Sequence, residues 1–473
     1  MRPGIRRTTA AATAGLLLLT GALPQASAQP SSTPATARPN SVPPDLPPGT
    51  QPPTDQAKPD VKYERTSKEC VASDTKNELI EAKPWGQVNL NLDQAHKFAT
   101  GKGIRIAIID TGVDPRNPRF GGRVKPGGEY VDNSKNANGT DDCDGHGTEV
   151  AGVAAAARTE GDFVGAAPAA EILAIRQTSD RYEFKGDAAN PDKRTSAGKV
   201  GTLAQAIVRA ADQNAKVINI SLTNCGTPKG FSSDDKALQA AIRYAVDVKD
   251  VVIVTAAGNL STQGAGCTKQ NDNLDPNNVN VVSSPAWFAD DVLSVGSIAR
   301  SGEVSTFSVW GPWVSIAAPG EEIISVDPKG TGLTNANVTA QETTDIKGTS
   351  FASPYVAGIT ALVRERFPDL KARQVMDRLK ATALHPGNIS GRDNKVGFGM
   401  VNPVAALTAV LPAEAAGYQK PQPKEMNTAV TPPQGLDWPP IIVALSGIGV
   451  GGALLMLTLF VRNSLSRKRT RQV

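Results

Sequence analysis

The segment Ile106-Ala-Ile-Ile-Asp110-Thr-Gly-Val113 decides the fold class of this chain. It is a short apolar run, rich in β-branched residues, that stops at an acidic residue and a turn. Such a run is typical of a buried parallel strand. Similar runs recur along the chain, and we expect strands at 104–109, 171–175, 217–222, 251–256, 292–298 and 314–318.

Helical stretches alternate with these strands, and we expect helices at 148–157, 201–213, 237–248, 350–367 and 372–383. The alternation predicts an α/β fold, in which helices cover both faces of a parallel sheet. Ligands of such sheets bind at the carboxyl ends of the strands, and Asp110 and Asn259 are expected there. Segments 178–200 and 261–284 lack a continuous apolar pattern, so we expect loops.

The two ends of the chain carry export and membrane signals. Residues 1–28 combine three arginines, a short apolar run and the cleavage sequence Ala26-Ser-Ala28, which predicts a signal peptide. The alternative, an uncleaved anchor, is disfavoured because the apolar run is short for a membrane span. Residues 441–461 are long and apolar enough to span a bilayer, and the basic tail at 462–473 predicts a cytoplasmic end. The alternative of a buried core helix does not explain this basic tail.

Between these ends the composition changes twice. Residues 29–84 begin with a Pro-rich extension, which we expect to be extended or disordered up to residue 60. The α/β pattern occupies 85–411, and a second Pro-rich stretch at 412–440 is expected to be a stalk. We therefore predict a single-pass protein whose main domain lies outside the cell membrane. The formal charge of +4 and the aromatic content of 5% disfavour a nucleic-acid partner.

The chain has four cysteines, which allow three disulfide pairings. We prefer Cys70–Cys143 and Cys225–Cys267, because these pairings close the shorter loops. The alternatives are free buried thiols or a metal site, but no Cys-x-x-Cys spacing supports a metal.

Three motifs supply an acid, an imidazole and a hydroxyl. The first ends in Asp110, the second is Asp144-Gly-His146-Gly-Thr148, and the third is Gly348-Thr-Ser350-Phe-Ala-Ser-Pro354. A nucleophilic serine needs a base to take its proton and a carboxylate to orient that base. Each residue alone has a simpler explanation: Asp110 and Asn259 as turn residues, and Ser350 as a helix N-cap.

The helix expected after Ser350 is apolar on nearly all sides, so it should be buried. Its first turn leaves backbone N–H groups unpaired, and these N–H groups and the helix dipole favour negative charge. The side-chain amide of Asn259 could donate a second hydrogen bond there. The set therefore predicts an oxyanion hole formed by Asn259 and the backbone of Ser350.

The three motifs, with Ala-Ala-Gly-Asn259 between the second and third, resemble those of the subtilase family of serine proteases. The resemblance covers about 85–411 and implies a subtilisin-like three-layer fold. It implies that Asp110 orients the base His146, that Ser350 attacks and that Asn259 serves the oxyanion hole. The segment that contains Ser221 and Leu222 resembles the family's substrate-binding edge strand. Phe351 and Tyr355 replace a common Met and a common His, which puts the pocket shape in doubt.

The order of the segments is also similar to that of the mycosins, the membrane-anchored subtilases of type VII secretion systems. This resemblance implies an extension that wraps the protease domain, protein or peptide substrates, and association with the secretion membrane complex. The chemistry needs no cofactor or metal. Two alternatives are a structural subunit with dispensable proteolysis and a non-peptidase esterase. The esterase is disfavoured because the Gly-x-Ser-x-Gly elbow is absent around Ser350.

Overall fold

A seven-stranded parallel sheet forms the centre of the first of two units, Met1–Leu411 and Pro412–Val473. The computed structural model describes residues 40–74, 80, 83–187, 190–228, 232–261, 267–272, 275, 278–338, 343–415 and 438–469. The predicted signal peptide and most of the predicted stalk lie outside these residues.

All six expected strands belong to this sheet, so the predicted fold class is confirmed. The seventh strand, β4, was not expected, because it contains Pro126 and two glycines, which strands disfavour. It lies at the sheet edge, where proline is tolerated. In spatial order the strands are β13 (Ile316–Pro319), β12 (Leu293–Ile298), β10 (Val252–Ala256), β8 (Val217–Ile220), β3 (Arg105–Asp110), β5 (Glu171–Arg176) and β4 (Val124–Glu129).

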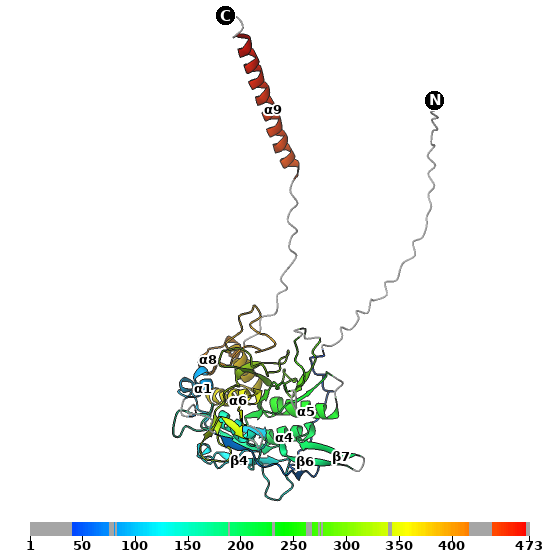
Figure 1. Cartoon of the computed structure of the whole chain (residues 1–473), viewed down its shortest axis with the longest axis vertical. Coiled ribbons are helices and arrows are strands. Elements are labelled where there is room, and N and C mark those ends of the chain that lie inside the picture. Colours follow the sequence, from blue (N-terminus) through cyan, green and yellow to red (C-terminus); the bar gives the residue numbers. More distant parts are fainter. Residues whose placement is uncertain are drawn as a thin grey trace, which may run out of the picture. The chain divides into compact units, whose positions relative to one another are not determined.

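Two pairs of helices pack beside the sheet, and Figure 1 labels three of these helices, α4, α5 and α6. Helix α3 (His146–Ala155) packs on α6 (Thr349–Arg366), and α4 (Val200–Asp212) packs on α5 (Ser233–Arg243). Helices α3 and α4 both contact β3 and β5. The expected apolar character of α6 is matched by burial of nearly its whole length. Helix α7 (Ala372–Ala381) contacts α6 and β10.

The remaining elements of the first unit are short. They include β9 (Asn224–Gly226), which pairs with β11 (Val282–Ser284) inside the segment expected to be a loop. The others are α1 (Trp85–Asn89), α2 (Leu92–Ala95), η2 (Pro118–Phe120), η3 (Tyr244–Val248), β14 (Ser325–Val326), β15 (Leu333–Thr334), β16 (Ala336–Val338), β17 (Thr343–Asp345) and α8 (Pro403–Thr408).

The prediction of a loop at 178–200 is wrong, because this segment forms an antiparallel hairpin of β6 (Ser179–Asp187) and β7 (Asn190–Ala197). The hairpin projects from the edge of the domain (Figure 1). Its described side chains are mostly partly or fully exposed, so the sequence lacks the apolar alternation that marks a half-buried strand.

The Pro-rich extension is ordered from residue 40 to 74 because it is bound along its length. The Asp55 carboxylate accepts a hydrogen bond from Tyr130 at 2.7 Å and forms an ion pair with Arg209 at 2.9 Å. Strand β1 (Glu64–Arg65) extends the β6–β7 hairpin, and β2 (Ala72–Asp74) pairs with β16. The extension therefore follows the surface of the domain, as the family resemblance implies.

Both preferred disulfides are present, Cys70–Cys143 and Cys225–Cys267. The first joins the extension to the loop that precedes His146, and the Val71 N–H also donates to the Cys143 carbonyl at 3.0 Å. The extension is thus held next to the predicted base by a covalent bond and a hydrogen bond.

The second unit contains η4 (Pro412–Glu414) and α9 (Trp438–Arg469). Within the described residues, Ile442–Leu465 of α9 is the one segment long and apolar enough to cross a membrane. This range includes most of the span expected at 441–461.

We predict that replacing Cys70 and Cys143 with serine lowers the free energy of unfolding by about 4 kcal/mol, because the bridge closes a long loop. Urea unfolding of the full-length protein in detergent measures this loss. Hydrogen exchange of Ala72–Asp74 should accelerate as well.

The Cys225→Ser/Cys267→Ser variant is the matched control for this experiment. It should also lose stability, because it opens a loop too, but it should keep protection of Ala72–Asp74. Unchanged protection of this strand in the Cys70→Ser/Cys143→Ser variant would contradict the role given to the first bridge.

Candidate active site

The predicted acid and base meet at the carboxyl edge of the sheet. Asp110 ends β3 and is fully buried, whereas His146 begins α3 and keeps part of its ring exposed. The Nδ1 atom of His146 lies 2.7 Å from Oδ1 of Asp110, and the Thr111 N–H donates to the same oxygen at 2.8 Å. The carboxylate therefore fixes the orientation of the imidazole.

Gly147 allows this close approach. A Cβ atom at this position would lie 2.1 Å from the Gly112 carbonyl oxygen and 3.0 Å from Cβ of Asp110. Any side chain would push α3 away from the end of β3. The glycine after the histidine is therefore required by packing.

Asp142 connects the two loops that carry the acid and the base. It is fully buried, and its Oδ1 accepts hydrogen bonds from the Thr111 hydroxyl at 2.9 Å and the Gly145 N–H at 2.8 Å. Its Oδ2 accepts from the N–H and the hydroxyl of Thr148, at 2.9 and 2.6 Å. Nothing in the sequence indicated this role for Asp142, although the residue lies in an acidic run next to Cys143.

Ser350 is the second residue of α6 and is largely buried. The N-cap is Gly348, so the simpler explanation of Ser350 as an N-cap does not hold. The Ser350 hydroxyl donates to the Ser221 carbonyl at 3.1 Å. In the described part of the chain, no hydrogen bond joins this hydroxyl to His146. The next residue, Phe351, has its ring centroid 5.3 Å from that of His146, so the start of α6 lies beside the predicted base.

The expected edge strand is only partly correct. Asn219 and Ile220 belong to β8, a central strand between β3 and β10, whereas Ser221 and Leu222 follow its end. The Ser221 hydroxyl donates to the Ser350 carbonyl at 2.7 Å. Asn219 donates to the Ser221 hydroxyl and accepts from the Ser353 hydroxyl, at 2.9 and 2.5 Å. This buried polar network ties the start of α6 to the end of β8.

Asn259 lies three residues after β10, beside the start of α6. Its Oδ1 accepts hydrogen bonds from the N–H and the hydroxyl of Thr349, at 2.9 and 3.0 Å. Within the described part of the chain its Nδ2 group has no hydrogen-bond partner. The amide is thus oriented by its oxygen while its donor side is available.

The two departures from the usual third motif have separate surroundings. Phe351 packs against the ring of His146 at an interplanar angle of 60°. Tyr355 is buried against α1, where a Cβ atom on Gly86 would lie 3.0 Å from the tyrosine hydroxyl. Tyr355 therefore serves packing between α6 and α1.

Electrostatics favour a protonated imidazole. Burial is the largest single effect and lowers the pKa of His146, but Asp110, Glu149 and Asp142 together raise it by more, and the result is about 9. Burial raises the pKa of Asp142 to about 6, against hydrogen bonds from Thr148 and Gly145 that lower it.

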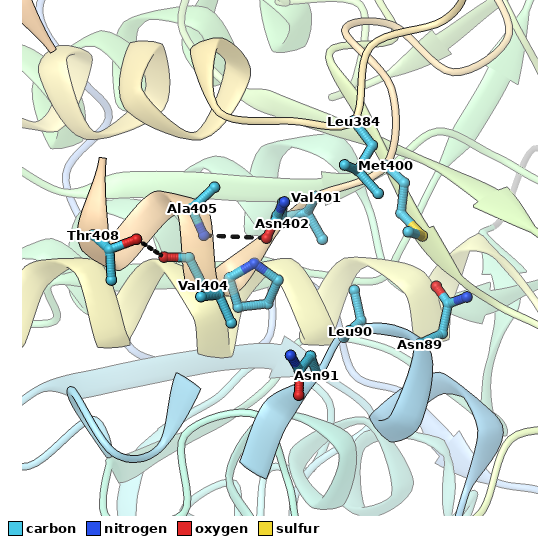
Figure 2. Close-up of a pocket in the computed structure, with 11 residues that line it drawn as sticks. Asn89, Leu90, Asn91, Leu384, Met400, Val401, Asn402, Val404, Ala405 and Thr408 are labelled. Atoms are coloured by element: carbon cyan, nitrogen blue, oxygen red, sulfur yellow. Dashed lines mark hydrogen bonds between the residues drawn. The ribbon is translucent and has the colours of Figure 1, made fainter. Parts of the chain in front are cut away.

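One cavity of the domain lies away from this site. It has a volume of about 480 Å³ and lies between the α1–α2 segment and α8 (Figure 2). None of the predicted catalytic residues lines it. Among the described residues no cluster of His, Cys, Asp or Glu side chains could hold a metal ion. The residues that line the cavity are Asn89, Leu90, Asn91, Leu384, Met400, Val401, Asn402, Pro403, Val404, Ala405 and Thr408.

Known proteins are similar to this chain both in sequence and in fold. The model of the subtilase family (Peptidase_S8) matches residues 101–399. Mycosin-1 of Mycobacterium tuberculosis is 44% identical over 402 residues, which are 81% of this chain and 86% of that protein.

Two solved structures illustrate the similarity of the fold. The MycP3 protease from the type VII (ESX-3) secretion system has a TM-score of 0.70 and 41% identity, and the match covers 78% of this chain and all of that one. A chain of the intact ESX-5 inner membrane complex has a TM-score of 0.70 and 36% identity, with coverage of 88% and 99%. The chain therefore belongs to the subtilase family of serine proteases and, within it, to the mycosins.

Proposed function

We propose that this protein is a membrane-tethered serine endopeptidase that uses Asp110, His146 and Ser350 and acts within a type VII secretion complex. The observation that carries the catalytic part is the 2.7 Å contact between Asp110 and His146, next to the start of α6. A buried carboxylate that orients an imidazole beside a serine is the arrangement of nucleophilic acyl transfer.

The hydrogen bond to Asp110 determines how the base works. It places the Nδ1 proton on the side of the carboxylate, so the neutral imidazole presents Nε2 as the base. Ser350 then leaves the Ser221 carbonyl by a rotation of its side chain, gives its proton to Nε2 and attacks the peptide carbonyl. The imidazolium returns this proton to the leaving amine, and water hydrolyses the acyl-enzyme by the same route.

Negative charge on the carbonyl oxygen is stabilised by two donors, the Nδ2 group of Asn259 and the backbone N–H of Ser350. The first turn of α6 leaves N–H groups free of intrahelical partners. The hydrogen bonds from Thr349 to the Asn259 oxygen hold the amide in place before the substrate arrives. Ser221 and Leu222 would line the substrate cleft, with Ser221 also positioning the nucleophile.

The proposed location follows from α9 and from the relatives. The apolar helix would anchor the chain once in the cell membrane, with the domain at 85–411 on the extracytoplasmic side and the basic end in the cytoplasm. Structures of the ESX-5 inner membrane complex and its periplasmic assembly contain similar chains. We infer that this protein occupies an equivalent place and acts on protein or peptide substrates.

A second function, as a structural subunit of the secretion complex, is favoured by the same relatives. A protein that holds a membrane complex together needs a fixed surface, and the extension bound through β1 and β2 adds to that surface. The two functions predict different results for a variant that lacks only the nucleophilic hydroxyl.

We predict that Ser350→Ala abolishes covalent labelling by a fluorophosphonate and stops substrate processing, because the attacking oxygen is lost. In a strain that lacks the wild-type protein, this variant at a normal level should still support secretion if the structural function is separate. Comparison of the secreted proteins measures both effects. Labelling of Ser350→Ala as fast as that of wild type would refute the proposed nucleophile.

Asn259→Ala should lower kcat by about 10²–10³-fold with little change in KM, because one oxyanion donor is lost; this magnitude comes from subtilisin. Kinetics on a cleaved peptide measure the effect. Asn271→Ala is a matched control, since this buried side-chain amide donates to the Val281 and Trp310 carbonyls and has no hydrogen bond to the start of α6 among the described residues. An unchanged kcat in Asn259→Ala would exclude the oxyanion role.

The activity should rise with pH up to about 9, because the imidazolium of His146 must lose its proton before it can act as a base. The rate of fluorophosphonate labelling should rise about tenfold per pH unit below this value and then level off. A pH profile of labelling on the full-length protein measures the midpoint. A midpoint near the ordinary histidine value of about 6.5 would contradict the influence of Asp110.

A further inference from the structure

Glu149 is a fully buried acidic residue one helical turn after His146 on α3. Its backbone is held at both ends, because its N–H donates to the Gly145 carbonyl at 3.1 Å and its carbonyl accepts from the Ser325 hydroxyl at 2.6 Å. The mechanism proposed above does not use its carboxyl group. A buried carboxylate is costly unless it is paired, so this position needs an explanation.

The partner of the Glu149 side chain is Asn337 on β16. The Asn337 amide donates to Oε2 of Glu149 at 3.4 Å. The other two oxygens of this pair, Oε1 of Glu149 and Oδ1 of Asn337, are buried and have no partner among the described residues. Two acceptors that lack donors on one pair of side chains indicate a missing proton.

A proton on Oε1 of Glu149 would satisfy both orphan oxygens at once. The acid would donate its O–H to Oδ1 of Asn337 and accept the amide N–H in return, as in a carboxylic acid–amide dimer. We propose that Glu149 is held as a protonated acid paired with Asn337, and that this pair is a positioning element for His146.

The pair connects the base to the extension. Asn337 is the central residue of β16, which pairs with β2 of the extension on one side and with β17 on the other. The same stretch of the extension is joined to Cys143, three residues before His146. The start of α3 is therefore held from two directions, by the disulfide to the extension before His146 and, after it, by the Glu149–Asn337 pair, whose strand β16 pairs with the extension.

The surrounding charges agree with a neutral Glu149. Burial raises its pKa to about 8, and the nearby Asp142 and Asp110 also raise it, whereas His146 and the Asn337 hydrogen bond lower it. At neutral pH Glu149 then adds no negative charge beside the base. Above about pH 8 it loses its proton, and the new charge holds the proton on His146 more tightly.

Infrared spectroscopy tests the proton without any need for activity. The difference spectrum between wild type and Glu149→Gln, recorded on full-length protein in detergent at neutral pH, should contain the carbonyl band of a protonated carboxylic acid. The band should disappear above about pH 8 as the acid ionises. Carboxylate bands alone at neutral pH would overturn the proposal. Glu160→Gln, a change at an exposed glutamate, should give no acid band.

Fluorophosphonate labelling of Ser350 tests the effect on the base, and this arm rests on the proposed function. At neutral pH Glu149→Gln should label at the wild-type rate, because glutamine keeps the pair and adds no charge. At higher pH the variant should reach its plateau earlier than wild type. Labelling about tenfold or more faster at neutral pH would show that Glu149 is ionised there, and would overturn the proposal.

Glu149→Leu removes the pair and tests positioning. Its labelling should be about tenfold slower or more at every pH, because the base is no longer held in place. A wild-type rate in this variant would overturn the positioning role. If Glu149→Leu does not fold, Asn337→Leu applies the same test from the other side of the pair. Absence of labelling in wild type would instead count against the proposed function, while the infrared result would still decide the proton.

Discussion

The active site depends on the hydrogen bonds of one buried carboxylate, that of Asp142. Its two oxygens accept four hydrogen bonds, from Thr111 on the loop after β3 and from Gly145 and Thr148 around the start of α3. These hydrogen bonds fix the loop after β3 relative to the start of α3. They therefore also fix the distance between Asp110 and His146. Ser350, the proposed nucleophile, is held in a similar way, by the network that joins Ser221 to α6.

Much of the fold could be predicted, because the central strands are short, buried and mostly apolar segments bounded by turn residues. The strand-end rule then placed Asp110 and Asn259 at one edge of the sheet, and the motif around His146 supplied the base. Strand β4 and the β6–β7 hairpin could not be predicted. A strand at a sheet edge or on the surface can form with few apolar residues, so its sequence resembles that of a loop.

The supporting residues of the site could not be predicted for a different reason. Whether an acidic residue such as Asp142 or Glu149 is exposed or buried depends on segments that approach it from elsewhere in the chain. Glu149 is covered by β14 and β16, nearly two hundred residues later in the sequence. Sequence motifs identify the reacting groups, whereas the residues that hold them depend on tertiary packing.

The way in which the extension is bound has a consequence for the solubility of the domain. Strands β1 and β2 are the outer partners of β6 and β16, so each covers a row of backbone N–H and C=O groups. If the extension were cut away, β6 and β16 would become open sheet edges, which readily pair with other chains. The extension thus protects two sheet edges of the domain from pairing with other chains.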